Sequence, residues 1–392
     1  MYKKTICTLI FVSVFSALCA QNTDTGAILL NRLKALQGRG VLIGHQDDAV
    51  YGSTWKYEHG RSDVLEICGD FPAVMGFDLG RLELGSDKNL DGVPFNIMRQ
   101  EIVAQHERGG IVTLSWHPCN PVNGKYHKDL SGKPVKSILK KNGAAKRTFD
   151  QWLERVASFL ASLKDKNGHP VPVIFRPWHE MTGDWFWWGT KTCTADQYKQ
   201  LYIYTYRLMK AKGLNNIVWC YSPGADSKET EQRYMAYYPG DAYVDILGVD
   251  IYDKTNRRDY VGDVQRELRI MSKIAAEHQK LFALTETGFK SNPEKEWYTQ
   301  KLLPAISTFQ PLYVLLWRNA WNLKDEVYGP APDKKNAPDF RKFHQNASTL
   351  FVKDIQHATS SPSSPSSSVP SNNTKPITTP TEEINLNNLI RQ

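Results

Sequence analysis

Eight short apolar runs recur along the chain, and most are followed by a segment with helical periodicity. The runs are rich in β-branched and aromatic residues and alternate little between apolar and polar, which is typical of parallel strands buried on both faces. The predicted strands are 41–45, 73–77, 111–117, 171–176, 217–221, 246–252, 282–285 and 312–317, and the clearest predicted helices are 148–163, 194–212, 264–278 and 297–309. Strand followed by helix, eight times over, predicts an α/β fold, a (β/α)8 (TIM) barrel forming a single catalytic domain. A doubly wound open sheet is the alternative.

The first twenty residues predict a secretory signal peptide. Two lysines precede an apolar stretch over 6–18, and small residues follow, ending in Cys19 and Ala20. The apolar stretch is too short to span a membrane permanently. Cleavage after Ala20 would export the chain to the periplasm or the extracellular space. Lipid attachment at Cys19 is the alternative, although Leu18 is bulkier than the residue expected before a lipidated cysteine.

The C-terminal segment has a different composition from the rest of the chain. Residues 359–381 are rich in Ser, Pro, Thr and Asn, which predicts a disordered tail. The expected organisation is therefore a signal peptide at 1–20, a barrel domain at 21–358 and a flexible tail at 359–392. No other run is long and apolar enough to predict a membrane span.

The spacing of the cysteines and the distribution of charge argue against a metal site and against nucleic-acid binding. The cysteines outside the signal peptide, Cys68, Cys119, Cys193 and Cys220, form no Cys-x-x-Cys pair, and no two histidines have metal-ligand spacing. We therefore expect no metal and no cofactor. The net charge of +8 is spread along the chain with acidic residues interleaved. This pattern indicates a solvated surface and no nucleic-acid partner, and a monomer is expected.

Two glutamates, Glu180 and Glu286, each follow closely on a short apolar run, and Glu180 lies in the tryptophan-rich stretch 176–189. Hydrolysis of a glycosidic bond requires one carboxyl group to protonate the leaving oxygen and a second to attack or stabilise the developing positive charge. Burial among aromatic rings raises the pKa of a carboxyl group. We therefore predict that Glu180 is the acid/base and Glu286 the nucleophile.

The predicted barrel brings these residues to one place. Active sites of such barrels lie at the C-terminal ends of the strands. Glu180 follows the fourth predicted strand, and Glu286 ends the seventh. Polar and aromatic residues that reach the same rim are Trp116, His117, Asp250, Tyr252, Trp317 and Arg318. One cleft lined by these side chains is expected, with the two carboxyl groups about 5 to 5.5 Å apart.

Three segments resemble glycoside hydrolase family 26, whose members are mostly β-mannanases of clan A. They are the stretch 175–189, Leu284-Thr-Glu-Thr-Gly288 and Trp317-Arg318. The resemblance implies a retaining (β/α)8 enzyme acting on a polysaccharide or oligosaccharide such as mannan or galactomannan, with Glu180 as acid/base, Glu286 as nucleophile and Tyr252 hydrogen-bonded to the nucleophile.

The resemblance also implies substrate contacts. His117 and His179 would line the subsite of the sugar being cleaved, and Trp317 would form the apolar floor under that reacting sugar. Trp185 would lie near the leaving-group sugar, and Arg318 would bind a neighbouring unit. Flat indoles bury the C–H faces of sugar rings and leave the hydroxyls free. Further predicted substrate-binding residues are Trp116, Arg176, Trp188 and Asp250.

The preferred substrate and the mode of attack stay open at this point. Relatives that cleave mixed-linkage β-glucan or β-1,3-xylan offer alternatives to internal cleavage of β-1,4-mannan. Two long rim segments, 118–147 and 319–338, suggest that one end of the cleft is closed and that mannobiose leaves from a chain end. A glycan-binding protein without catalytic activity is the alternative from another class.

Overall fold

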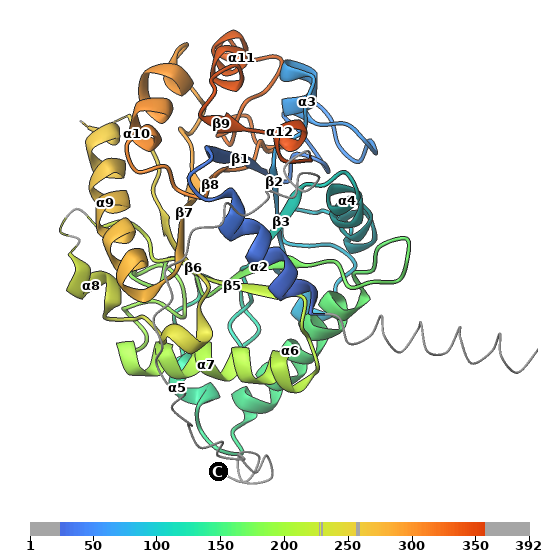
Figure 1. The fold of residues 1–392 in the computed structure, drawn as a ribbon. Coiled ribbons are helices and arrows are strands. Elements are labelled where there is room, and N and C mark those ends of the chain that lie inside the picture. The colour runs from blue at the N-terminus through green and yellow to red at the C-terminus, as the bar shows by residue number, and fades with distance from the viewer. Residues whose placement is uncertain (1–23, 227, 229, 256–258, 357–392) are drawn as a thin grey trace, which may run out of the picture.

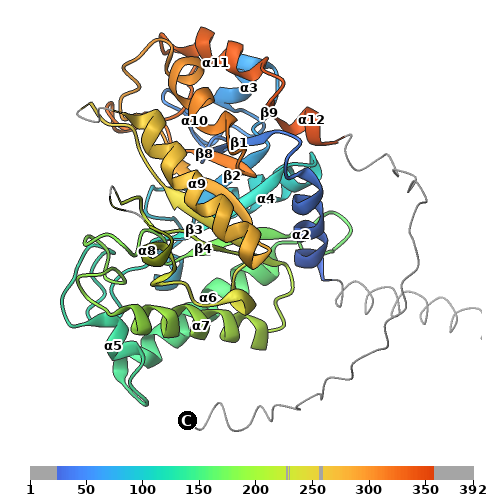
Figure 2. The same ribbon diagram turned by 60° about the vertical axis from the view of Figure 1, so that its left-hand side comes forward.

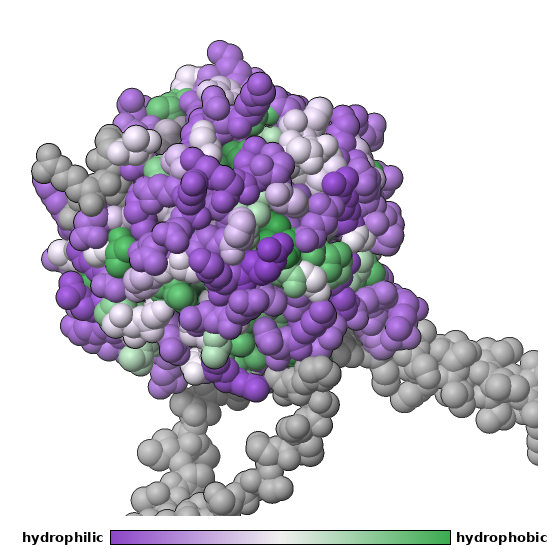
Figure 3. Space-filling model, turned by 90° about the horizontal axis from the view of Figure 1, so that it is seen from above, coloured by the Kyte–Doolittle hydropathy of each residue, from purple (hydrophilic) through white to green (hydrophobic). Residues whose placement is uncertain are grey.

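The computed structural model describes residues 24–226, 228, 230–255 and 259–356. The predicted signal peptide and the predicted tail lie outside the described residues. Within the described part, no helix is both long and apolar enough to span a bilayer. The face shown in Figure 3 is largely hydrophilic, with hydrophobic residues in small separate groups.

Eight parallel strands form a closed barrel (Figures 1 and 2). They are β1 (Val41–Gln46), β2 (Val74–Asp78), β3 (Ile111–Trp116), β4 (Val173–Pro177), β5 (Ile217–Tyr221), β6 (Ile246–Asp250), β7 (Leu281–Thr287) and β8 (Tyr313–Leu316). The barrel closes because β1 pairs with β2 on one side and with β8 on the other. This confirms the predicted (β/α)8 fold and all eight predicted strands.

The strand boundaries differ from the predicted ones by up to two residues. The chain enters β4 at Val173 and not at Val171, because Pro172 has no N–H to donate to a neighbouring strand. Strand β6 ends at Asp250, where its register with β7 shifts, so Tyr252 lies beyond the strand. A two-residue strand, β9 (Thr349–Leu350), adds to the outside of β1 and was not predicted.

The helices surround the barrel (Figure 2). They are α2 (Thr25–Leu36), α3 (Asp63–Cys68), η1 (Leu82–Leu84), α4 (Phe95–Glu107), α5 (Pro134–Ile138), α6 (Ala144–Ser162), α7 (Ala195–Ala211), α8 (Glu231–Met235), η2 (Asp241–Tyr243), α9 (Tyr260–His278), η3 (Tyr298–Leu302), α10 (Leu303–Ser307), α11 (Ala337–His344) and α12 (Val352–Gln356). The predicted helix 297–309 begins as the π-helix η3 and continues as α10.

Local sequence signals account for two of the long helices. Helix α7 begins after Thr194, whose side chain accepts from the Gln197 N–H while the Gln197 side chain accepts from the Thr194 N–H. This reciprocal capping box satisfies two backbone donors at the helix start. Helix α6 buries a stripe that includes Phe149, Leu153 and Leu160. The helical spacing of these residues is what predicted the helix.

The strands separate two apolar cores. One lies between the sheet and the surrounding helices and contains, for example, Ile43 and Phe175. The other contains Leu42, Ile174 and Leu315, and Leu33 of α2 packs into it. Consecutive residues such as Leu42 and Ile43 thus belong to different cores, as expected for strands buried on both faces. This packing holds the C-terminal strand ends that position the site.

Candidate active site

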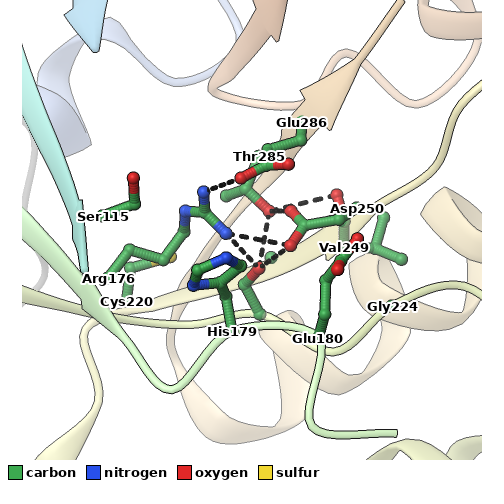
Figure 4. Close-up of polar contacts among 12 residues, drawn as sticks. Ser115, Arg176, His179, Glu180, Cys220, Gly224, Val249, Asp250, Thr285 and Glu286 are labelled. Carbon is green, nitrogen blue, oxygen red and sulfur yellow. Dashed lines mark hydrogen bonds and ion pairs between the residues drawn. The ribbon is translucent and has the colours of Figure 1, made fainter. Parts of the chain in front are cut away.

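Glu180 and Glu286 come together at the C-terminal ends of β4 and β7 (Figure 4). One carboxylate oxygen of each, together with one from Asp250, lies within 4.8 Å of the other two. Glu180 has a left-handed backbone with φ of 53°, and its N–H donates to the Ser222 carbonyl at 2.7 Å. Sparsely populated backbone of this kind is common where a chain must aim a functional side chain.

The environment of Glu180 favours its protonated form. The pKa of Glu180 is raised to about 7, because of burial first and the negative charge of Glu286 second. The Trp185 indole N–H donates to Glu180 Oε2 at 2.8 Å and opposes this shift. Glu180 can therefore hold a proton near neutral pH, as a general acid must.

Glu286 is surrounded by donors instead. The Tyr252 hydroxyl donates to Glu286 Oε2 at 2.6 Å, and the Arg176 guanidinium forms an ion pair with Oε1. Burial alone would lower the pKa of Arg176, but Asp250 and Glu286 raise it, so the guanidinium stays charged. These two donors fix the orientation of the Glu286 carboxylate, and Arg176 compensates its charge.

Asp250 lies next to the two glutamates and is fully engaged by the protein (Figure 4). It accepts from Arg176 at 2.9 Å, from the Ser222 hydroxyl at 2.8 Å and from the Thr285 hydroxyl at 2.6 Å. Burial raises the pKa of Asp250 well above its usual range, although Arg176 opposes this. Three carboxylates in this arrangement could coordinate a cation, but Arg176 already pairs with two of them.

A cavity of about 560 Å³ opens over Glu180 and Glu286. Its lining includes five residues predicted from sequence: His117, Glu180, Tyr252, Glu286 and Trp317. Six further lining residues were not predicted, namely Asp253, Lys254, Thr255, Phe289, Lys290 and Tyr328. Five of these six lie within four residues of Tyr252 or Glu286, so their proximity to predicted site residues could have indicated them. Tyr328 lies far beyond the end of β8, and no strand end marks it.

Two histidines lie beside the pair, and their pKa values are shifted in opposite directions. His117 Nδ1 lies 2.7 Å from Asp78 Oδ2, and His117 Nε2 lies 3.0 Å from His179 Nε2. Burial alone would lower the pKa of His117, but Asp78 raises it. The pKa of His179 is lowered well below its usual range by burial, then by Arg176 and His117. The two imidazoles therefore differ in environment: Asp78 favours the charged form of His117, and burial favours the neutral form of His179.

Several predicted substrate-binding residues are buried beneath the cavity. The side chains of Arg176, His179 and Asp250 are almost inaccessible to solvent, and none of them lines the cavity. Their polar groups bind Glu286, His117 and one another, because a buried charge needs such partners. They therefore position the residues that face the cavity, and direct substrate contact of these three stays a prediction.

Of the four predicted substrate-binding tryptophans, two lie in the core and two lie at the cleft. Trp116 donates to Glu83 at 3.1 Å and Trp188 to the His179 carbonyl at 2.7 Å, and both side chains are fully buried. Neither indole lines the cavity, so contact of these two with the substrate stays a prediction that their burial does not support. Trp185 is 40% exposed beside Glu180, and Trp317 lines the cavity. Both can contact a sugar ring.

Arg318 is also engaged by other protein groups. It forms ion pairs with Asp91 at 2.8 Å and with Glu326 at 2.8 Å, and it does not line the cavity. Asp91 follows β2, and Glu326 follows β8. Arg318 thus links two rim segments, and its contact with a sugar unit stays a prediction.

Comparisons with known proteins agree with this site. The family model of glycosyl hydrolase family 26 matches residues 19–317. A mannan endo-1,4-beta-mannosidase of Bacillus subtilis is 34% identical over 297 residues, which cover 73% of this chain and 74% of that protein. A mannan endo-1,4-beta-mannosidase of Bifidobacterium adolescentis is 32% identical over 314 residues, but the match covers only 31% of its length.

Solved structures give the same result. A GH26 beta-mannanase from Bacteroides ovatus has 43% sequence identity and a TM-score of 0.82, covering 85% of this chain and 96% of that one. An endo-beta-1,4-mannanase double mutant from Cellulomonas fimi has 30% identity and a TM-score of 0.79, covering 86% of this chain and 78% of that one. The resemblance of the Glu180 and Glu286 motifs is therefore confirmed, and the chain belongs to glycosyl hydrolase family 26.

Proposed function

We propose that the protein is a retaining β-mannanase that hydrolyses β-1,4-mannosidic bonds of mannan and galactomannan. The observation that carries this proposal is the pair Glu180 and Glu286, with carboxylate oxygens within 4.8 Å at the base of the cavity. Inverting enzymes separate their carboxyl groups by roughly 6.5–9.5 Å to accommodate a water molecule, whereas retaining enzymes keep them at about 5 Å. The names of the Bacillus and Bifidobacterium relatives support mannan as the substrate.

The mechanism proposed has two displacements. In the first, a Glu286 oxygen attacks the anomeric carbon, the glycosidic bond breaks, and protonated Glu180 gives its proton to the leaving oxygen. In the second, ionised Glu180 takes a proton from water, and the water oxygen attacks the anomeric carbon and releases Glu286. Tyr252 and Arg176 hold Glu286 in line for both steps.

Release of reducing sugar from locust-bean galactomannan tests the proposal. We expect activity in the wild type and a loss of about 10³-fold or more in Glu286→Ala, because the covalent intermediate cannot form. Glu277→Ala, at an exposed position on α9, is the matched control. Binding of galactomannan without release of sugar by the wild type would favour a non-catalytic glycan-binding protein. Faster cleavage of lichenan or β-1,3-xylan would reject mannan as the substrate.

One observation favours attack near a chain end. Arg318 ties the segment after β2 to the segment after β8 through Asp91 and Glu326, and the Ser53 hydroxyl donates to Asp333 at 2.6 Å across the same side of the barrel. Joined segments of this kind would close one end of the cleft. We expect mannobiose as the main early product from mannohexaose. A random spread of product sizes at early times would reject closure of the cleft.

Export of the chain is also part of the proposal, supported by the charged, apolar and small-residue order of residues 1–20. Mass spectrometry of the mature protein should find an N-terminus at Gln21. A lipid-modified Cys19 at the N-terminus would instead indicate a membrane-anchored enzyme.

A further inference from the structure

Tyr328 reaches the active site from a hairpin that no apolar run marks in the sequence. Asn319 and Val327 form an antiparallel bridge after β8, and Tyr328 follows directly. The Tyr328 N–H lies 3.2 Å from Asn319 Oδ1 and 3.3 Å from the Arg318 carbonyl, so it donates at the base of this hairpin. The Tyr328 ring lines the same cavity as Glu286 and Trp317.

The base of the hairpin is fixed by contacts to other rim segments. The Asn319 side-chain amide donates to Asp63 at 3.2 Å and to the Pro330 carbonyl at 2.7 Å. Arg318 adds ion pairs to Asp91 and Glu326. Asp63 lies at the start of α3 and Asp91 after β2, whereas Glu326 and Pro330 belong to the segment after β8 itself. The position of Tyr328 is therefore set by the barrel and not by the hairpin alone.

The Tyr328 ring packs against the residue that orients the nucleophile. The rings of Tyr328 and Tyr252 meet edge to face, with centroids 5.5 Å apart and planes at 69°. Tyr252 in turn donates to Glu286 Oε2 at 2.6 Å. Edge-to-face pairs restrain both rings. Displacement of Tyr328 would free Tyr252 and loosen the hydrogen bond on which the nucleophile depends.

Gly288 makes this approach possible. A Cβ built on Gly288 would lie 2.8 Å from the Tyr328 Cβ, which is closer than real Cβ contacts come. Gly288 also has φ of 150°, a conformation that favours glycine. The backbone two residues after Glu286 therefore leaves space for this one aromatic residue of the hairpin.

The hydroxyl of Tyr328 is left without a protein partner among the described residues, and the side chain is only partly buried. Burial first, and then the negative charge of Glu326, raises the pKa of Tyr328 to about 12. The group thus stays a neutral O–H that can donate to a sugar hydroxyl or accept from one.

We propose that Tyr328 has two functions in the reaction: its ring positions Tyr252, and through it Glu286, and its hydroxyl binds a hydroxyl of the mannose unit held in the cavity. This inference rests on the proposed mannan hydrolysis. It assigns a specificity-determining contact to the hairpin after β8, in addition to the predicted residues on the strand ends.

Two substitutions separate the ring from the hydroxyl. Tyr328→Phe keeps the packing and removes one hydrogen bond, so we expect a KM for mannohexaose about three- to ten-fold higher with kcat unchanged. Tyr328→Ala also removes the ring, and kcat should fall about ten-fold or more in addition. Leu323→Ala, at an exposed position in the same hairpin, should keep wild-type kinetics.

The rate of covalent labelling of Glu286 gives a second readout. A 2-deoxy-2-fluoro-β-mannosyl fluoride reacts with the nucleophile, loses fluoride and leaves a slowly hydrolysed glycosyl ester, detected by mass spectrometry. At saturating reagent, labelling should be slower in Tyr328→Ala and close to wild type in Tyr328→Phe. A purely structural role would change the melting temperature without this split between the variants.

The outcomes distinguish this inference from the proposed function. An inactive wild type would reject mannan hydrolysis as a whole. If the wild type is active and Tyr328→Ala has the same kcat and KM, only the proposed role of Tyr328 is overturned. If Tyr328→Ala does not fold, an unchanged KM in Tyr328→Phe still rejects the sugar contact, and an unchanged labelling rate in Tyr328→Leu rejects the positioning role.

Discussion

Glu180 and Glu286 are the same residue type, and their neighbours divide the chemistry between them. Glu180 borders the cavity beside an indole, and burial raises its pKa to about 7. Glu286 is paired with Arg176 and accepts from Tyr252. Glu180 therefore keeps its proton to a higher pH than an isolated carboxyl group does. This asymmetry fits the proposed roles of Glu180 as acid and Glu286 as nucleophile.

The pH profile of kcat/KM should report the acid. Because Glu180 must be protonated, activity should decline as pH rises through about 7. In Trp185→Phe, the hydrogen bond that lowers the pKa of Glu180 is lost, so the alkaline limb should move to higher pH. Trp321→Phe, at another exposed indole, is the control. An alkaline limb that moved to lower pH in Trp185→Phe would contradict the assignment.

The same shift predicts a stability effect. The folded pKa of Glu180 lies above its ordinary value of 4.5, so folded protein keeps a proton that unfolded chain releases between about pH 4.5 and 7. Stability is therefore lost as pH rises through this window. Glu180→Gln should raise the free energy of unfolding at pH 8, where the carboxyl group is charged, and not at pH 4. The expected gain is only about 1 kcal/mol, since partial exposure screens the charge.

Thermal melts at the two pH values measure this difference. Glu277→Gln should show no such difference between the two pH values, because its carboxyl group is exposed on α9. An equal change in melting temperature at both pH values would show that Glu180 acts through packing and not through its charge.

At the scale of elements, the hairpin after β8 is held by a charge network. Removal of Arg318 would leave the Asp91 carboxylate, which is about 10% exposed, without its cation. Breaking a buried pair from one side commonly costs about 3–5 kcal/mol. Arg318→Met should therefore lower the free energy of unfolding by about 3 kcal/mol and increase the share of longer products from mannohexaose.

Denaturant unfolding and product analysis measure both effects. Lys334→Met removes an exposed pair with Asp333 and should cost less than about 1 kcal/mol with no change in products. An Arg318→Met variant that releases mannobiose as the wild type does would show that Arg318 does not close the cleft.

Gly288 links β7 to the same hairpin. Gly288→Ala adds a Cβ within 2.8 Å of the Tyr328 Cβ, so we expect kcat to fall about ten-fold or more as Tyr328 moves from Tyr252. Gly168→Ala is the matched control, because Gly168 also has positive φ but would meet no atom within 4 Å. Equal activity of both variants would mean that the approach of Tyr328 is not needed.

For the whole molecule, the last contacts with the barrel among the described residues come from α12. Val352 and Ile355 are buried, and Gln356 donates to the Arg108 carbonyl. A chain ending at residue 358 should keep the kcat/KM and melting temperature of the full chain. A chain ending at Phe351 loses two buried side chains worth about 1.5–3 kcal/mol each, and its melting temperature should fall. Reduced stability of the 358-residue chain would show that the tail contributes to the fold.

The barrel and the proximity of Glu180 and Glu286 could be predicted because their signals are local. Each strand is a short continuous apolar run, and Glu180 and Glu286 follow such runs closely. The roles of the tryptophans could not be predicted in this way. Trp185 and Trp188 lie three residues apart in one stretch, yet Trp185 borders the cleft and Trp188 is buried beneath it. Both tryptophans lie in the same aromatic stretch, so local composition could not distinguish their positions.

The amino-acid sequence by itself determined the eight barrel strands and their order, because strands buried on both faces are continuous apolar runs. It also determined which strand ends carry the two glutamates. Only the tertiary structure decided which polar groups face the cavity and which, like Arg176 and Asp250, support it from below. It alone placed Tyr328 against Tyr252. These relations join residues distant along the chain, and they depend on the closure of the barrel and the packing of its loops.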